Sequence, residues 1–282
     1  MQNSSEKTAG HSWAPFSIRV DYEYNPTIRN FFSVSSGRWM VKKLEERRGE
    51  FNEVVKAMAG YKEQFQKISF EPENTVKPYW NQNWFPSFDG ISLYSFLAMN
   101  NPESYVEIGS GNSTRFARQA ITDHGLRTRI VSIDPSPRAE IDDICDEIIR
   151  QKIEDVDFNI FQSKVKSGDV LFIDNSHRSF QGSDVTIAFT EIVPSLPSGV
   201  IYGFHDIFLP FDYPSWFTEH FYNEQYLLFC YLLGGAGGDE ILFPTWYISN
   251  MRHLCQPLYS IFEGTDLDIV SKGGSSFWLK KY

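Results

Sequence analysis

The chain has 282 residues, of which 41% are hydrophobic and 16% aromatic, and its formal net charge is −10. This length supports one sizeable domain with an extension, and the negative charge disfavours nonspecific binding to nucleic acid or to an anionic membrane. Three cysteines without C-x-x-C spacing indicate reduced thiols, not a disulfide framework or a zinc site. We expect a cytoplasmic protein without a membrane partner, because the polar start has no signal-peptide core and no apolar run reaches about 18 residues.

Residues 1–79 are expected to form an irregular segment followed by an amphipathic helical extension. From about Ser36 to Ile68, apolar residues recur at three-, four- and seven-residue steps, which is the pattern of a helix with one buried face. A break at Gly49 or at Gly60 stays open. We expect the extension to pack on the domain that follows. A dimer contact or a substrate lid is the alternative, and a homo-oligomer is compatible with either.

Residues 80–282 alternate between apolar runs and helical patterns. Strands are expected near 104–109, 128–134, 146–150, 169–174 and 199–205, and helices near 89–100, 113–124, 137–144, 182–194 and 215–233, with further helix at 248–263. Such alternation predicts an α/β fold, in which a doubly wound, mostly parallel sheet has helices on both faces.

The most informative motif runs from Tyr105 to Thr114, where an apolar run ends in Gly109 and Gly111 and a helix is expected to begin. Glycines let the backbone turn tightly and approach a ligand, and the first N–H groups of a helix are unpaired. A second apolar run ends at Asp134, whose carboxylate can accept hydrogen bonds from a ribose diol. The pattern predicts a site for a nucleoside-containing cofactor. The alternative is a tight strand-to-helix turn without a ligand.

Two departures from the dinucleotide pattern G-x-G-x-x-G indicate which cofactor. Thr114 stands at the third glycine position, and Glu107 would repel a pyrophosphate but suits the cationic groups of S-adenosylmethionine. With this acid-x-Gly-x-Gly motif and the later strand-ending acids, residues 80–282 resemble the class I S-adenosylmethionine-dependent methyltransferases. The resemblance implies a Rossmann-like, seven-stranded sheet closed by an antiparallel pair at 240–243 and 275–280. It also implies cofactor contacts from Glu107, Gly109, Ser110, Gly111, Asn112, Ser113, Thr114, Asp134 and Asp174.

Polar residues also follow the fourth and fifth expected strands. Asp174 and His177 come after the fourth strand, and His205 and Asp206 end the fifth. The carboxyl ends of parallel strands meet at the edge where ligands bind, so we expect these side chains to face the same crevice as the glycine loop. Any one of the four could instead cap a loop or bond locally, whereas the four together favour a functional site.

Within the family, the sequence resembles catechol-type and bacterial natural-product sugar O-methyltransferases. Those enzymes bind a metal through acids at the ends of the fourth and fifth strands, and catechol-type enzymes place a base three residues after the first acid. The match implies Asp174 and Asp206 as ligands of Mg²⁺ or another divalent cation, and His177 as the base. Ile207 stands where catechol-type enzymes have a third ligand, Asn, so the requirement for a metal stays open.

The function expected from these observations is methyl transfer from S-adenosylmethionine to a hydroxyl of a small molecule or sugar, with His177, Asp174 and Asp206 as the catalytic residues. No nucleic-acid partner is expected. An NAD(P)-dependent oxidoreductase is one alternative, disfavoured by Thr114 and Glu107. A nucleotide-sensing or interaction module without activity is the other. Aromatic residues at 80–88 and 210–216 could wall a substrate pocket or anchor loops.

Overall fold

The computed structural model describes residues 21–282, so the first 20 residues of the expected irregular segment lie outside the described residues. The strands are β1 (Ser104–Ile108), β2 (Arg129–Ile133), β3 (Glu147–Ile149), β4 (Val170–Ile173), β5 (Ile201–Phe204), β6 (Glu240–Pro244) and β7 (Phe277–Lys280). The α-helices are α1 (Ser35–Glu46), α2 (Arg48–Ala59), α3 (Lys62–Phe65), α4 (Ser87–Asn100), α5 (Asn112–His124), α6 (Phe158–Lys164), α7 (Asp184–Ile187), α8 (Val193–Ser195), α9 (Glu224–Leu233), α10 (Thr245–Ser249) and α11 (Arg252–Tyr259).

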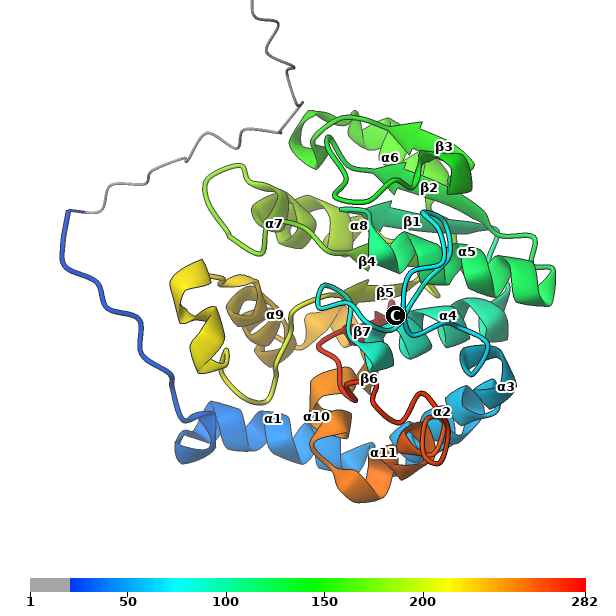
Figure 1. Ribbon diagram of the computed structural model, residues 1–282. Coiled ribbons are helices and arrows are strands. Elements are labelled where there is room, and N and C mark those ends of the chain that lie inside the picture. Colours follow the sequence, from blue (N-terminus) through cyan, green and yellow to red (C-terminus); the bar gives the residue numbers. More distant parts are fainter. Residues whose placement is uncertain (1–20) are drawn as a thin grey trace, which may run out of the picture.

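These strands form one sheet in the order β3-β2-β1-β4-β5-β7-β6. The first five strands in this order run parallel, and β7 lies antiparallel between β5 and β6. Helices α4 and α5 lie on one side of the sheet, and α7, α8 and α9 lie on the other (Figure 1). Every residue of β4 and β5 is buried, as expected for strands covered on both faces. The predicted fold class, a doubly wound and mostly parallel seven-stranded sheet, is therefore confirmed.

The N-terminal helices pack on this sheet domain, beside its β6 edge (Figure 1). Met40 and Leu44 of α1 and Phe51 and Val55 of α2 are fully buried and belong to the same hydrophobic cluster as the strands. Helix α2 lies along α11, and the Phe51 ring meets the Tyr247 ring edge to face, with 6.4 Å between centroids. The helical extension thus shares one core with the rest of the chain.

The breaks in this extension fall at one expected and one unexpected position. Helix α2 ends before Gly60, as anticipated, but α1 ends at Glu46 and the chain bends at Arg47, not at Gly49. The Arg47 guanidinium pairs with Glu50 and with Glu240 on β6. The bend is therefore accompanied by an ion pair between residues far apart in the sequence. It does not occur at a glycine, so the local sequence did not predict its position.

Three expected helices differ in the structure. The helix expected at 137–144 is absent, and only a 3₁₀ turn at Asp142–Ile144 forms there. The span is short, and Asp142 and Asp143 have low helix propensity. The span 215–233 divides into a 3₁₀ turn, Ser215–His220, and α9, because Phe221 between them has a left-handed φ of +54°. The span 182–194 forms α7, a π-helical turn at Ala188–Ile192 and α8. Helix α6 was not expected from the sequence.

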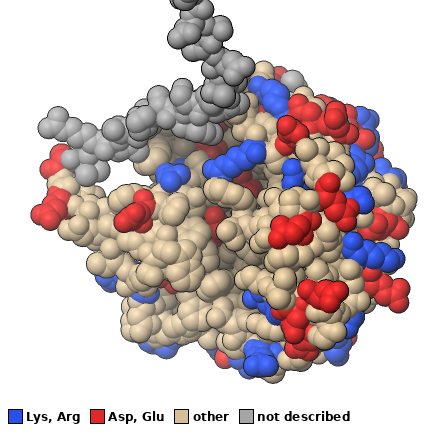
Figure 2. All heavy atoms as spheres, in the orientation of Figure 1, with Lys and Arg blue, Asp and Glu red and all other residues tan. Residues whose placement is uncertain are grey.

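The surface carries both signs of charge. On the face shown in Figure 2, Lys and Arg side chains are interspersed with Asp and Glu, and no continuous basic area appears on it. Among the described residues, no helix combines the length and the apolar character that a membrane span requires.

Candidate functional site

The carboxyl ends of β1, β2, β4 and β5 lie side by side because the parallel register aligns their last residues. Ile108 pairs with both Ile133 and Ile173, and Ile173 pairs with Phe204. The next residue of each strand therefore lies on one edge of the sheet. These four residues are Gly109, Asp134, Asp174 and His205.

The two glycines of the loop after β1 have different structural roles. Gly109 has a φ of +80°, and a Cβ there would lie 1.8 Å from the backbone carbonyl oxygen of Asp174. The neighbouring strand end thus requires glycine at this position, and the contact of Gly109 with a cofactor stays a prediction. A Cβ on Gly111 would meet no atom within 4 Å. This open space lies at the N-terminus of α5, so Gly111 is where a ligand can approach the backbone.

Glu107 lies beneath this loop and is fully buried. Its carboxylate accepts hydrogen bonds from the hydroxyls of Tyr105 and Thr114, and the Thr114 hydroxyl accepts one from the N–H of Gly111 at 3.1 Å. Burial raises the pKa of Glu107 to about 7, because these hydrogen bonds offset only part of the desolvation. Glu107 therefore supports the loop from below through Thr114.

Asp134 joins the loops that follow β1 and β2. Its Oδ2 accepts a hydrogen bond from the N–H of Ser110 at 2.7 Å, and its Oδ1 accepts one from the N–H of Ser136 at 2.7 Å. The Ser110 hydroxyl also bonds the Ser132 hydroxyl at 2.8 Å. A carboxylate offers about four lone-pair sites, so half-buried Asp134 keeps capacity for a ribose diol.

The other predicted loop residues lie at the start of α5. Asn112 donates from Nδ2 to Oε1 of Gln82 at 3.2 Å and accepts at Oδ1 from Arg115 at 3.2 Å. Ser113 is buried and donates to Glu107. The contact with Gln82 brings the segment before α4 to the edge where the glycine loop lies.

Most aromatic side chains of the two flanking segments anchor loops. Trp80, Phe85 and Tyr213 are buried, whereas Trp84 and Trp216 are each 66% exposed. Buried rings of this kind contribute packing area. Tyr213 also lines a pocket with Phe211 and Trp246.

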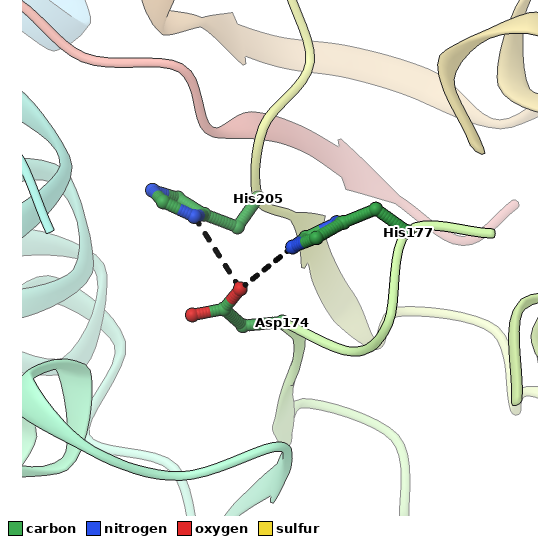
Figure 3. A group of neighbouring side chains, drawn as sticks. All are labelled: Asp174, His177 and His205. Carbon is green, nitrogen blue, oxygen red and sulfur yellow. Dashed lines mark ion pairs between the residues drawn. The ribbon is translucent and has the colours of Figure 1, made fainter. Parts of the chain in front are cut away.

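Four polar side chains converge at the ends of β4 and β5, and three of them are drawn in Figure 3. Oδ1 of Asp174 lies 3.2 Å from Nε2 of His177 and 3.4 Å from Nδ1 of His205. The Asp206 carboxylate lies 3.5 Å from Nε2 of His177 and 3.7 Å from Nδ1 of His205. The residues expected to share one crevice do lie together, whereas their chemical roles stay predictions.

Each histidine is held on its far side by a buried carboxylate. Nδ1 of His177 lies 2.8 Å from Oε2 of Glu224, the first residue of α9. Nε2 of His205 lies 3.2 Å from Oδ2 of Asp89, in the first turn of α4. Asp89 and Glu224 are both fully buried, and Asp89 also accepts hydrogen bonds from two backbone N–H groups that precede β7. These contacts fix the orientation of both imidazole rings.

The histidines and carboxylates of this cluster shift one another's pKa values. Burial lowers the pKa of both histidines, but hydrogen bonds and the surrounding carboxylates outweigh it and hold both pKa values well above the usual range. Burial raises the pKa of Asp174, but His205 and His177 outweigh that effect and hold it well below its usual value. Among the described ion pairs, none joins a lysine or arginine to Asp89, Asp174, Asp206 or Glu224.

Two of these residues have an unusual backbone conformation. His177 has a φ of +59° and Asp206 a φ of +53°, both in the left-handed region that side-chain-bearing residues rarely adopt. Such conformations persist where the surrounding structure determines them strongly.

Sequence reasoning missed Asp89 and Glu224 and gave His205 no specific role. The Asp89–His205 contact spans 116 residues and the His177–Glu224 contact spans 47. Neither follows a local spacing. One signal was available in the sequence. Asp89 and Glu224 each lie near the start of a helix, α4 and α9, and the N-termini of these helices reach this edge of the sheet.

Residues 106–207 match the model of a family described as a methyltransferase domain. The match runs from β1 to the residue after Asp206, so it covers the glycine loop and the cluster at the ends of β4 and β5. This part of the chain is therefore similar to a methyltransferase domain, and it lies in a sheet of the order described above.

Comparison with other proteins adds little beyond the family. No curated protein matches the chain significantly. One solved structure with a related arrangement is coclaurine N-methyltransferase bound to N-methylheliamine and SAH, with 9% identity and a TM-score of 0.36. That alignment covers 89% of this chain and 96% of the other. This likeness does not bear on the substrate of the present protein.

Proposed function

We propose that the protein transfers a methyl group from S-adenosylmethionine to a hydroxyl of a small molecule or sugar. The observation that carries this proposal is the position of the open Gly111 loop and Asp134 on the same sheet edge as the Asp174–His177–His205–Asp206 cluster. A proposed cofactor site would thereby adjoin a group of charged side chains, as transfer between a bound donor and a bound acceptor requires.

On the donor side, the start of α5 and Asp134 would bind the cofactor. Helix N–H groups and the uncovered backbone at Gly111 suit the polar end of S-adenosylmethionine, and the free lone pairs of Asp134 suit its ribose.

On the acceptor side, a hydroxyl has too high a pKa to be ionised near neutral pH. It requires a base, a cation that lowers its pKa, or both. The sequence assigned the base to His177 and a divalent cation to Asp174 and Asp206. In the folded protein both ring nitrogens of His177 face carboxylates, so the ring has no nitrogen directed freely toward an acceptor. This geometry favours a cation over His177 as the group that promotes deprotonation.

Cofactor binding is tested by calorimetry with S-adenosylhomocysteine. We expect micromolar binding to the wild-type protein and a rise in melting temperature, because a ligand bound by the native state stabilises it. Gly111→Val should abolish binding, since the branched side chain fills the space at the start of α5. Gly49→Val is the matched control, because a Cβ at this exposed glycine also meets no atom within 4 Å. Tight binding of NAD without binding of S-adenosylhomocysteine would refute the proposal.

Turnover is tested by incubating the protein with S-adenosylmethionine and a panel of hydroxylated small molecules and sugars, and measuring S-adenosylhomocysteine release. His177→Gln should lower turnover by about 10²–10⁴-fold with unchanged cofactor affinity, whether the ring acts as a base or as a ligand. The exposed His253→Gln variant is the control. Cofactor binding without turnover on any acceptor class would instead favour a sensing module.

A further inference from the structure

We infer that the cluster at the ends of β4 and β5 is a transition-metal site in which His177, His205 and Asp174 are the ligands and Asp206 lies within reach. The metal class is a divalent first-row ion such as Zn²⁺, Co²⁺, Fe²⁺ or Mn²⁺. The ligand set differs from the sequence prediction, which placed Mg²⁺ or another divalent cation on Asp174 and Asp206.

The first support is convergence of donor atoms. Asp174, His177 and His205 each direct one ligand atom into a volume in which these atoms lie within 4.8 Å of one another. The donors are Nε2 of His177, Nδ1 of His205 and a carboxylate oxygen of Asp174, and they come from the loops that follow β4 and β5 (Figure 3). Two imidazoles and one carboxylate form a set that binds divalent transition metals and leaves coordination positions open.

The second support is the pair of buried carboxylates behind the histidines. Metal-binding histidines almost always donate their other ring N–H to a carboxylate, a carbonyl or water, which fixes the tautomer and the ring orientation. Here Glu224 contacts Nδ1 of His177 and Asp89 contacts Nε2 of His205, each opposite the nitrogen that faces Asp174. The two rings use different nitrogens for the cluster, and in both cases the remaining nitrogen has a carboxylate partner.

The third support is charge. Four carboxylates surround two imidazoles, and no described lysine or arginine pairs with any of them. A buried excess of negative charge is costly unless a cation compensates it. A divalent ion at the point where Asp174, His177 and His205 meet would supply that compensation.

The ligand types also decide between metals. Mg²⁺ prefers oxygen ligands and keeps several waters, whereas imidazole suits Zn²⁺, Fe²⁺ and related ions. With two of three donors being nitrogen, the site should select against Mg²⁺.

The site is accessible on the side of the two aspartates. The Asp174 side chain is 28% exposed and that of Asp206 is 17%, whereas His177 and His205 are almost fully buried. A bound ion would therefore be reached from the side of the two aspartates, where an acceptor hydroxyl could coordinate it and lose its proton more easily. Metal binding itself does not depend on methyl transfer, so failure of one proposal leaves the other standing.

The test is titration of the metal-stripped, full-length protein with Co²⁺, followed by visible absorption, in the absence of S-adenosylmethionine. We expect about one Co²⁺ to bind per chain, with a visible absorption spectrum typical of Co²⁺ bound by imidazole nitrogen. Zn²⁺ should displace the bound Co²⁺, and millimolar Mg²⁺ should not. His205→Gln and His177→Gln should abolish the spectrum, and Glu224→Gln should weaken Co²⁺ binding by about 10–100-fold, because Glu224 orients a ligand without being one. The exposed His253→Gln variant should bind Co²⁺ like the wild type.

Two results would overturn the inference. One is the absence of a Co²⁺ spectrum in the folded wild-type protein, which does not depend on any variant being stable. The other is Co²⁺ binding that survives in both histidine variants while their circular dichroism shows an intact fold. Displacement of Co²⁺ by Mg²⁺ as readily as by Zn²⁺ would contradict the assignment of nitrogen ligands. It would favour a site formed by the oxygens of Asp174 and Asp206 instead.

Discussion

Gly109 and Gly111 are two residues apart, yet a side chain should have different consequences at the two positions. Gly109→Ala should destabilise the protein by about 2 kcal/mol or more, because its φ is +80° and its Cβ would overlap the carbonyl oxygen of Asp174. Gly111→Ala should change stability by less than about 1 kcal/mol, since its Cβ meets no protein atom within 4 Å. Urea unfolding of both variants makes the comparison. Equal losses would show that the loop needs both glycines for folding.

Glu107 should make stability depend on pH. Its pKa is about 7 in the folded protein, against an ordinary value of 4.5, so the stability gained by holding the proton is full below about pH 4.5 and is lost as pH rises through 7. Glu107→Gln removes this titration. The difference in unfolding free energy between the two proteins should therefore move in favour of the variant by about 2–3 kcal/mol from pH 5 to pH 8. Denaturant melts at both pH values measure it, and parallel pH dependences would contradict it.

At the residue scale, strand-ending polar residues were predictable and their partners were not. Asp134, Asp174 and Asp206 each end an apolar run, so the parallel sheet was enough to place them on one edge. Asp89 and Glu224 approach that edge from the starts of α4 and α9, and only the folded arrangement brings them to the histidines.

Among the elements, the N-terminal helices are part of the main core and should unfold with it. Phe51→Ala should destabilise the protein by about 3–5 kcal/mol, because the ring is fully buried between α2 and the region of Tyr247. Glu53→Ala on the exposed face of α2 should cost no more than about 0.5 kcal/mol, since its ion pair with Lys56 is solvent-exposed. One cooperative transition is expected for both variants in urea. A separate early transition for Phe51→Ala would instead indicate an independent N-terminal unit.

Strands were predicted more accurately than helices for a physical reason. A buried strand is a short apolar run, which the sequence displays directly, and all seven lie within a few residues of their expected positions. The bend at Arg47 and the short α6 depend on tertiary contacts or span too few turns for a periodic pattern. The helix expected at 137–144 was wrong: the span is short and contains Asp142 and Asp143, which have low helix propensity, so only a 3₁₀ turn forms.

For the molecule as a whole, the net charge of −10 disfavours association with other negatively charged molecules. Long-range repulsion should keep it from duplex DNA, and basic side chains on the face in Figure 2 are neighboured by acidic ones. We expect no binding to labelled random-sequence DNA at micromolar protein and about 0.15 M salt, measured by fluorescence anisotropy. Binding that weakens steeply with added salt would reveal a basic groove on another face.

The left-handed backbone at His177 and Asp206 has a consequence for how this sequence would respond to selection. Each position costs roughly 1–2 kcal/mol relative to a residue that tolerates positive φ, and glycine or asparagine would relieve part of that cost. In a library screened only for thermal stability, substitutions at these two positions should therefore be enriched for glycine and asparagine. The same library screened for turnover should keep histidine and aspartate. If the two screens select different residues at these two positions, the left-handed conformations lower folding stability but are needed for turnover.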